Sequence, residues 1–213
     1  MKLIQLAVGA LVALNGVFVA TGAQVIVYDS FGAGNSYNSG VAWAVSGAST
    51  SGGYRGQAEF FVPGTSGYLA GIQVATIHLS GSLLSNFYIA QDNGSGIPGA
   101  ILETYSNVVN ANGTMSIGSA THPLLQAGQE YWLCDEPATS DANNGWYENS
   151  QNVANGFAFE RSEWSWSAIT GSVPPSGVFR VTVTPVPEPT AAGLMALGGG
   201  WLGFRLRRLR ASK

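Results

Sequence analysis

The chain has 213 residues, and only 10% of them are charged, compared with about 25% in an average soluble domain. The formal net charge of the whole chain is −3, but residues 24–184 contain only three basic residues against eleven acidic ones, a net charge of −8. A segment so poor in lysine and arginine cannot neutralise many phosphates, which argues against nucleic-acid binding. Its length suffices for a single domain with its own hydrophobic core.

The N-terminus has the pattern of a secretory signal peptide. Lys2 supplies a positive start, and residues 3–20 form an apolar stretch without a charge. Small residues follow this stretch, which predicts a signal helix in residues 1–23 and cleavage by signal peptidase between Ala23 and Gln24. An uncleaved membrane anchor is the alternative, because about eighteen apolar residues approach the length that spans a bilayer.

Residues 24–184 are predicted to form an extracellular domain of short strands, because no window has a sustained helical period. Segments of β-branched and aromatic residues alternate with Gly, Asn, Pro and Ser turns, which favours an all-β fold, an antiparallel β-sandwich of jelly-roll-like type. Residues 32–53 are expected to be a long loop around a weak strand at 41–45. The predicted strands are 24–31, 54–62, 69–79, 86–92, 101–109, 114–119, 129–135, 144–149, 153–160, 164–169 and 178–184.

The C-terminal segment, residues 185–213, has three parts in order. Pro187, Glu188 and Pro189 come first, then an apolar run at 191–204, and last a basic stop formed by Arg205, Arg207, Arg208 and Arg210. A helix of fourteen residues is about 21 Å long, whereas the bilayer core is about 30 Å thick. We therefore expect a short transmembrane helix that is processed after export, with its arginines on the cytoplasmic side. An ordinary single-pass anchor is the alternative.

This order of parts resembles the PEP-CTERM sorting signal of Gram-negative bacteria. The resemblance covers about 25 residues, roughly 185–210. It implies recognition by an exosortase, a membrane transpeptidase, and cleavage near Pro187-Glu188-Pro189. The mature protein would then be released or attached at the cell surface, often in species that produce exopolysaccharide.

The body contains no distinct catalytic or metal-binding motif. His78 and His122 have no second histidine, cysteine or acid at metal-ligand spacing, and the G-x-S-x-G motif of serine hydrolases is absent. We expect no metal site and no catalytic residue, and we interpret the glutamates as solvated acids on outer strand faces. A β-sandwich glycosidase with two facing carboxylates is the less favoured alternative. The glutamates are Glu59, Glu103, Glu130, Glu148, Glu160 and Glu163.

Two oxygen-rich loops and one thiol need a separate interpretation. Residues 92–96 and 135–144 contain side-chain oxygens that could hold Ca²⁺, but turn formation explains both loops equally well. No cofactor is therefore expected. Cys134 follows Trp132 and Leu133 on a predicted strand, which indicates a buried free thiol.

Aromatic residues are concentrated between positions 131 and 166. Flat rings on a rigid sheet suit stacking against sugars, and Trp146, Tyr147, Trp164 and Trp166 are the candidates. Core packing is the alternative for each of these rings. Trp146 is flanked by Asn144 and Gly145 in a polar segment, so we expect it to be the most exposed tryptophan.

Two stretches of the body carry a second resemblance. Residues 89–102 read IAQDNGSGIPGAIL, and residues 125–133 read LQAGQEYWL. Together they resemble the choice-of-anchor R type of surface domain. The resemblance implies a β-sandwich joined to an interchangeable sorting signal, and it implies no particular biochemical activity.

These observations predict a non-enzymatic structural or interaction protein, secreted or attached to the surface of a Gram-negative bacterium. Signal peptidase and exosortase are the expected partners during export, with a precursor transiently in the inner membrane. Exopolysaccharide of a biofilm matrix is the expected partner afterwards. Because the body has a net charge of −8, we do not expect it to bind anionic polysaccharide without a bridging cation. A carbohydrate-binding module with exposed tryptophans is the alternative function.

Overall fold

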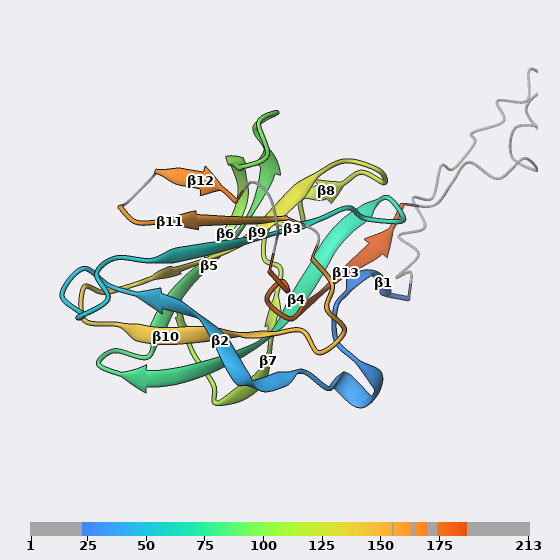
Figure 1. The fold of residues 1–213 in the computed structure, drawn as a ribbon. Helices are drawn as coiled ribbons and strands as arrows, with labels where there is room; N and C mark the ends of the chain where they lie inside the picture. Colours follow the sequence, from blue (N-terminus) through green and yellow to red (C-terminus); the bar gives the residue numbers. More distant parts are fainter. Residues whose placement is uncertain (1–22, 155, 163–164, 170–173, 187–213) are drawn as a thin grey trace, which may run out of the picture.

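The computed structural model describes residues 23–154, 156–162, 165–169 and 174–186, and in these ranges the protein consists of antiparallel β-sheets (Figure 1). A single 3₁₀ turn, η1 (Ala33–Asn35), is the helical element of the described ranges. No helix among the described residues is long and apolar enough to cross a membrane. The expected signal helix, the motif Pro187-Glu188-Pro189, the short transmembrane helix and the arginines of the basic stop lie outside these residues.

The first sheet has seven strands, and β4 is its centre. Strands β1, β13, β4, β10 and β2 are neighbours in that order, while β7 and β8 also pair with β4. The bounds are β1 Val25–Asp29, β13 Phe179–Pro185, β4 Gly67–Ser80, β10 Asn143–Glu148, β2 Asn38–Ser46, β7 Gly113–Gly118 and β8 Leu124–Leu125. The strand β2 is therefore one edge of this sheet.

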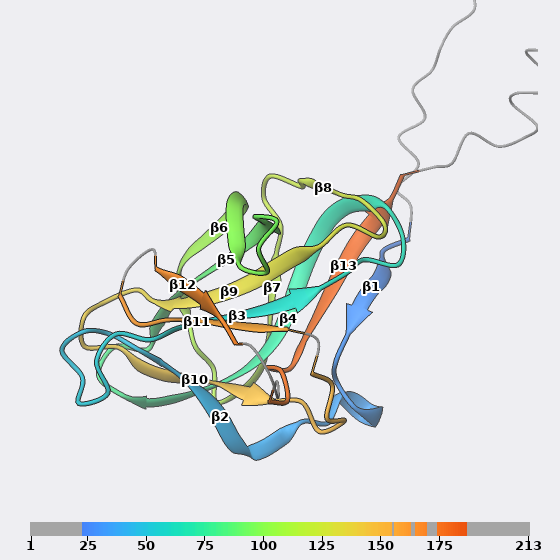
Figure 2. The same cartoon turned by 45° about the horizontal axis from the view of Figure 1, so that its top comes forward.

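The second sheet has six strands, in the order β12, β11, β3, β9, β5 and β6, so β6 is one of its edges. The bounds are β12 Trp166–Ala168, β11 Phe157–Glu160, β3 Gly56–Phe61, β9 Tyr131–Pro137, β5 Leu84–Asp92 and β6 Pro98–Val109. Figure 2 shows β11, β3 and β9 lying above β10 and β2 of the first sheet.

The two sheets enclose one hydrophobic core. Successive strand residues point to opposite faces, so alternate apolar residues of each strand point inward. On β13 the buried residues are Phe179, Val181 and Val183, and they join Phe87 of β5 and Leu133 of β9 in one cluster. Because residues of both sheets meet in this cluster, the body is β-sandwich-like.

The strand prediction is largely confirmed. Each of the eleven predicted segments overlaps an observed strand. The expected long loop around a weak strand is instead the nine-residue strand β2, which pairs with β10 from Ser46 opposite Asn143 to Asn38 opposite Glu148. The two-residue strand β8 was not expected, since so short a segment carries no periodicity.

Both ends of the body lie at the same end of the first sheet. The strands β1 and β13 are antiparallel neighbours, with Val25 opposite Val183, and Figure 1 shows them side by side. Ala23 and Gln24, the expected cleavage position, are exposed just before β1. The chain therefore enters and leaves the body beside one sheet end, with the β2–β3 loop toward the other.

Candidate functional site

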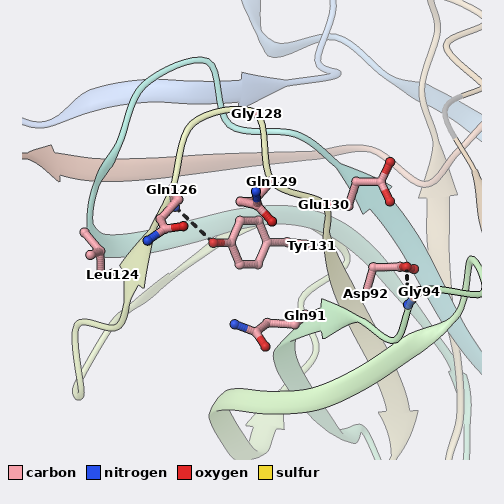
Figure 3. A pocket seen from close by; sticks show the side chains of 9 residues that line it. All are labelled: Gln91, Asp92, Gly94, Leu124, Gln126, Gly128, Gln129, Glu130 and Tyr131. Carbon is pink, nitrogen blue, oxygen red and sulfur yellow. Dashed lines mark hydrogen bonds between the residues drawn. The ribbon is translucent and has the colours of Figure 1, made fainter.

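A polar cleft of about 480 Å³ lies at the end of β5 and the start of β9. Its walls come from the two stretches that carry the second resemblance, residues 89–102 and 125–133, which the fold brings together. Figure 3 shows the side chains around it. The polar cleft is lined by Gln91, Asp92, Gly94, Leu124, Gln126, Gly128, Gln129, Glu130 and Tyr131.

One wall of the cleft is the turn after β5, which Asp92 fixes. Its two carboxylate oxygens accept hydrogen bonds from the indole Nε1 of Trp132 at 2.8 Å and from the backbone N of Gly94 at 2.7 Å. Gly94 has a φ of 86°, a conformation that residues with a side chain rarely adopt. The D-x-G sequence is therefore required by the turn, which holds this wall in one shape.

The opposite wall is the turn between β8 and β9. The backbone N of Gln129 donates to the carbonyl of Gln126 at 3.2 Å, and the backbone N of Gln126 donates to the hydroxyl of Tyr131 at 2.9 Å. Gly128 closes the turn with a φ of 75°. Figure 3 shows the Tyr131 ring lying between the walls with its hydroxyl toward Gln126.

The cleft is lined by three amide side chains and two acidic ones, without an exposed aromatic face. Gln91, Gln126 and Gln129 are exposed, and each amide offers both donors and acceptors. Glu130 is exposed, and the lining contains no basic side chain. Tyr131 is only 3% exposed, so it provides a floor and no stacking surface. This lining suits a neutral ligand with many hydroxyl groups.

The first of the two loops considered for Ca²⁺ uses its oxygens in internal hydrogen bonds. Asp92 accepts the two hydrogen bonds already described, and the Oδ1 of Asn93 accepts one from the backbone N of Ser95 at 2.8 Å. In the second loop Asp135 is fully buried whereas Asp141 is exposed. No group of three His, Cys, Asp or Glu side chains with metal-site geometry occurs among the described residues.

The expectation that Trp146 is exposed is wrong. Its side chain is 0% exposed, and its ring lies 5.8 Å from Phe179 and 6.3 Å from Phe87. Its Nε1 donates to the carbonyl of Val178 at 2.9 Å. Gly177 lies directly against the indole, because a Cβ there would be 2.8 Å from Cδ2 of the ring. Strand β10 is internal to its sheet, so its inward side chains face the core even in a polar segment.

The remaining stacking candidates do not share a surface with Trp146. Tyr147 follows it on β10 and points to the opposite face, where it is half-buried and its ring lies 5.1 Å from that of Tyr37. Trp166 belongs to β12 of the other sheet and packs, half-buried, on a cluster that includes Trp132. Trp164 lies outside the described residues.

The interpretation of the glutamates as solvated outer-face acids is wrong for four of the six. Glu59, Glu103, Glu148 and Glu160 are buried, Glu130 is exposed in the cleft, and Glu163 lies outside the described residues. The buried ones accept internal hydrogen bonds. The backbone N of Gly177 donates to Glu59 at 2.6 Å, and that of Ser165 donates to Glu160 at 2.9 Å. Burial raises the pKa of Glu59 well above its usual range, although Gly177 and Ser176 offset part of this effect.

The two histidines and the cysteine have structural surroundings. Nδ1 of His78 lies 3.0 Å from Oδ1 of Asn144, and Nδ1 of His122 lies 2.9 Å from the carbonyl of Leu69. Cys134 is buried and free, which confirms that prediction. Burial also raises the pKa of its thiol well above the usual range, so the reactive thiolate is disfavoured.

The sequence marks both walls of the cleft, because they carry the second resemblance. It does not indicate that the two stretches meet in one site. Comparison with known proteins does not assign it either: no family model matches the chain, and no curated protein matches it.

Proposed function

We propose that this chain is a non-enzymatic protein, exported to the surface or the extracellular matrix of a Gram-negative bacterium, whose body binds neutral polysaccharide in the polar cleft. The observation that carries the binding proposal is the set of three exposed glutamines in a cleft without basic residues. Sugar hydroxyls both donate and accept hydrogen bonds, and amides match them in both roles. Glycine-dependent turns hold both walls, so little conformational entropy is lost on binding.

The export part of the proposal depends on the terminal segments. The signal pattern of residues 1–23 and the resemblance of residues 185–210 to a PEP-CTERM signal support processing by signal peptidase and then by an exosortase. The adjacency of Val25 and Val183 is compatible with this route, because both processed segments would leave the body at one end. We also propose that the β-sandwich is of the jelly-roll-like type.

Mass spectrometry of protein purified from its native host tests the processing. The mature protein is expected to begin at Gln24 and to lack the basic tail 205–210. Recovery of an intact C-terminus in surface or matrix material would contradict the exosortase route. It would leave the binding proposal to be judged by its own test.

Binding in the cleft is tested by isothermal titration of residues 24–186 fused to a solubility tag, and of the full chain, with maltotriose and cellotriose as neutral probes. The Gln91→Ala/Gln129→Ala double variant is expected to bind the preferred probe at least tenfold more weakly, because two amide partners are lost. Thr104→Ala is the control, since Thr104 is an exposed polar residue on β6 outside the cleft lining. Absence of binding by the unaltered protein, or equal binding by the double variant, would overturn the proposal.

A further inference from the structure

A second pocket of about 210 Å³ opens between β2 of the seven-stranded sheet and β3 and β11 of the six-stranded sheet. We call it the arginine pocket and define it by Trp43, Arg55, Gln57, Phe157, Phe159 and Arg161. Pockets for drug-sized ligands start at about 300 Å³. The arginine pocket is therefore of a size for one ring with its substituents.

The pocket gathers most of the positive charge of the body. Residues 24–184 have three basic residues, and Arg55 and Arg161 are two of them. The third, Arg180, makes the one ion pair found among the described residues, with Asp29 at 2.7 Å. Arg55 donates from Nε to the carbonyl of Gly52 at 3.2 Å, and the Arg161 guanidinium lies 5.2 Å from the Phe159 ring centroid. Neither pairs with a carboxylate of the described residues.

One acid also lines the pocket, but it is already bonded within the protein. Glu160 is 0% exposed. It accepts hydrogen bonds from the backbone N of Ser165 at 2.9 Å and from the hydroxyl of Tyr54 at 3.4 Å. Among the described residues, neither exposed arginine of the pocket is therefore neutralised by a carboxylate.

An aromatic wall stands beside the arginines. Trp43 is half-buried, and its ring centroid lies 4.8 Å from that of Phe157. The Nε1 of Trp43 donates to the carbonyl of Pro175 at 3.0 Å, which fixes the plane of the indole. A fixed indole offers an apolar face to the C–H face of a ring, as tryptophan does at many interfaces.

The floor of the pocket has an unused acceptor. Gln57 donates from Nε2 to the carbonyl of Ala44 at 2.6 Å, but its buried Oε1 has no hydrogen-bond partner among the described residues. Buried amide oxygens are nearly always satisfied by protein or by ordered water. The floor of the pocket is therefore polar at Gln57, and two arginines lie in its lining.

We propose that the arginine pocket binds a hexuronate unit, a sugar ring that carries a carboxylate. The carboxylate lies between Arg55 and Arg161, whose planar guanidiniums match carboxylate geometry. The ring lies on Trp43, beside the Gln57 side chain that lines the pocket. This proposal extends the proposed function to acidic polysaccharide, at a site separate from the polar cleft.

The proposal revises the expectation that anionic polysaccharide needs a bridging cation. That expectation used the net charge of the whole body, −8. At physiological ionic strength exposed charges are screened beyond about 8 Å. A bound carboxylate would therefore respond mainly to the charges that line the pocket, which are the two guanidiniums and Glu160.

The test is isothermal titration with tri-galacturonate in EDTA, with maltotriose as the neutral probe. The Arg55→Gln/Arg161→Gln variant is expected to bind tri-galacturonate at least tenfold more weakly. The Arg55→Lys/Arg161→Lys variant keeps the charge but loses the planar donor pair. Its affinity for tri-galacturonate is expected to lie between those of the unaltered protein and the Arg→Gln variant. Gln91→Ala/Gln129→Ala should leave this binding unchanged, which separates a failure of this proposal from a failure of the cleft proposal.

Three results would overturn the proposal. The first is that the unaltered protein does not bind tri-galacturonate in EDTA. The second is that the Arg→Gln variant binds as tightly as the unaltered protein. The third is that sodium sulfate at matched ionic strength competes as well as galacturonate does, because the pocket would then recognise negative charge without recognising a sugar acid.

Discussion

Residues of the same type have different surroundings on the internal strands and on the edge strands of the two sheets. Trp146 on the internal strand β10 lies directly opposite Trp43 on the edge strand β2. Trp146 is fully buried and Trp43 only half-buried. The internal tryptophan is surrounded by core rings, whereas the edge tryptophan forms the wall of a pocket. The position of a strand within its sheet thus decides whether a ring is enclosed by the core or lines a pocket.

Carboxylates in the six-stranded sheet show the same difference. Glu103 on the edge strand β6 accepts hydrogen bonds from Ser119, Ala120 and Thr121, in the segment after β7, and from Tyr105. Burial alone would raise its pKa, but these donors outweigh burial and hold the pKa below its usual value.

Asp135 on the internal strand β9 has no such loop beside it. Burial raises its pKa well above the usual range, and the nearby Ser85 hydroxyl offsets only part of this effect. The backbone groups of neighbouring strands are already used in the ladder. A carboxylate at a sheet centre therefore lacks the donors that an edge can recruit from loops.

The largest expected effect is a loss of stability on replacing the internal tryptophan of the pair. Trp146→Ala removes a fully buried indole and should lower the free energy of unfolding by about 3–5 kcal/mol, as for other buried tryptophans. Urea unfolding followed by circular dichroism measures this loss. Trp43→Ala is the matched control, and it should lose less than half as much because its ring is partly solvated. Equal losses would show that the edge position does not matter for stability.

A smaller effect is expected for the edge carboxylate. Glu103→Gln loses charge-assisted hydrogen bonds and should cost about 2 kcal/mol at neutral pH. Since the folded pKa is lowered, this stability is present above about pH 4.3, the usual pKa of glutamate, and is lost as pH falls through the folded pKa. The unfolding curves of variant and unaltered protein should therefore converge in acid. A difference that persists there would mean that Glu103 stabilises the fold through its shape rather than its charge.

The effect expected for the internal carboxylate has the opposite sign. Because the folded pKa of Asp135 is raised, the folded state holds the proton more tightly, and stability falls as pH rises above about 3.9, the usual pKa of aspartate. Asp135→Asn has no proton to lose, so its unfolding midpoint in urea should rise relative to the unaltered protein between pH 4 and pH 7. A constant difference across that range would contradict this assignment.

The sequence was sufficient for most strands, because alternation of apolar residues and turn-forming glycines are local signals. It was insufficient for β2, since the Ser- and Gly-rich stretch 38–46 owes its strand form to pairing with β10. Trp146 was misjudged for the same reason, because its polar neighbours indicate a loop only until the strands on both sides of β10 are known.

The candidate sites depend on contacts between segments far apart in the chain. The cleft joins Gln91 to Gln129, and the arginine pocket joins Trp43 and Arg55 to Arg161. No local sequence pattern indicates that these segments come together. The buried glutamates are a similar case, because the partners of Glu59 and Glu103 are Gly177 and Ser119, which become neighbours only in the folded sheets.

The position of β13 has a mechanical consequence. This strand lies between β1 and β4 and is antiparallel to both. A pull applied beyond Pro185 acts along the axis of β13, so the hydrogen bonds on its two sides are loaded in shear and must break together. A hairpin pulled from its open end breaks its bonds one after another. A force applied to the C-terminal strand is therefore resisted by both of its strand pairings at once.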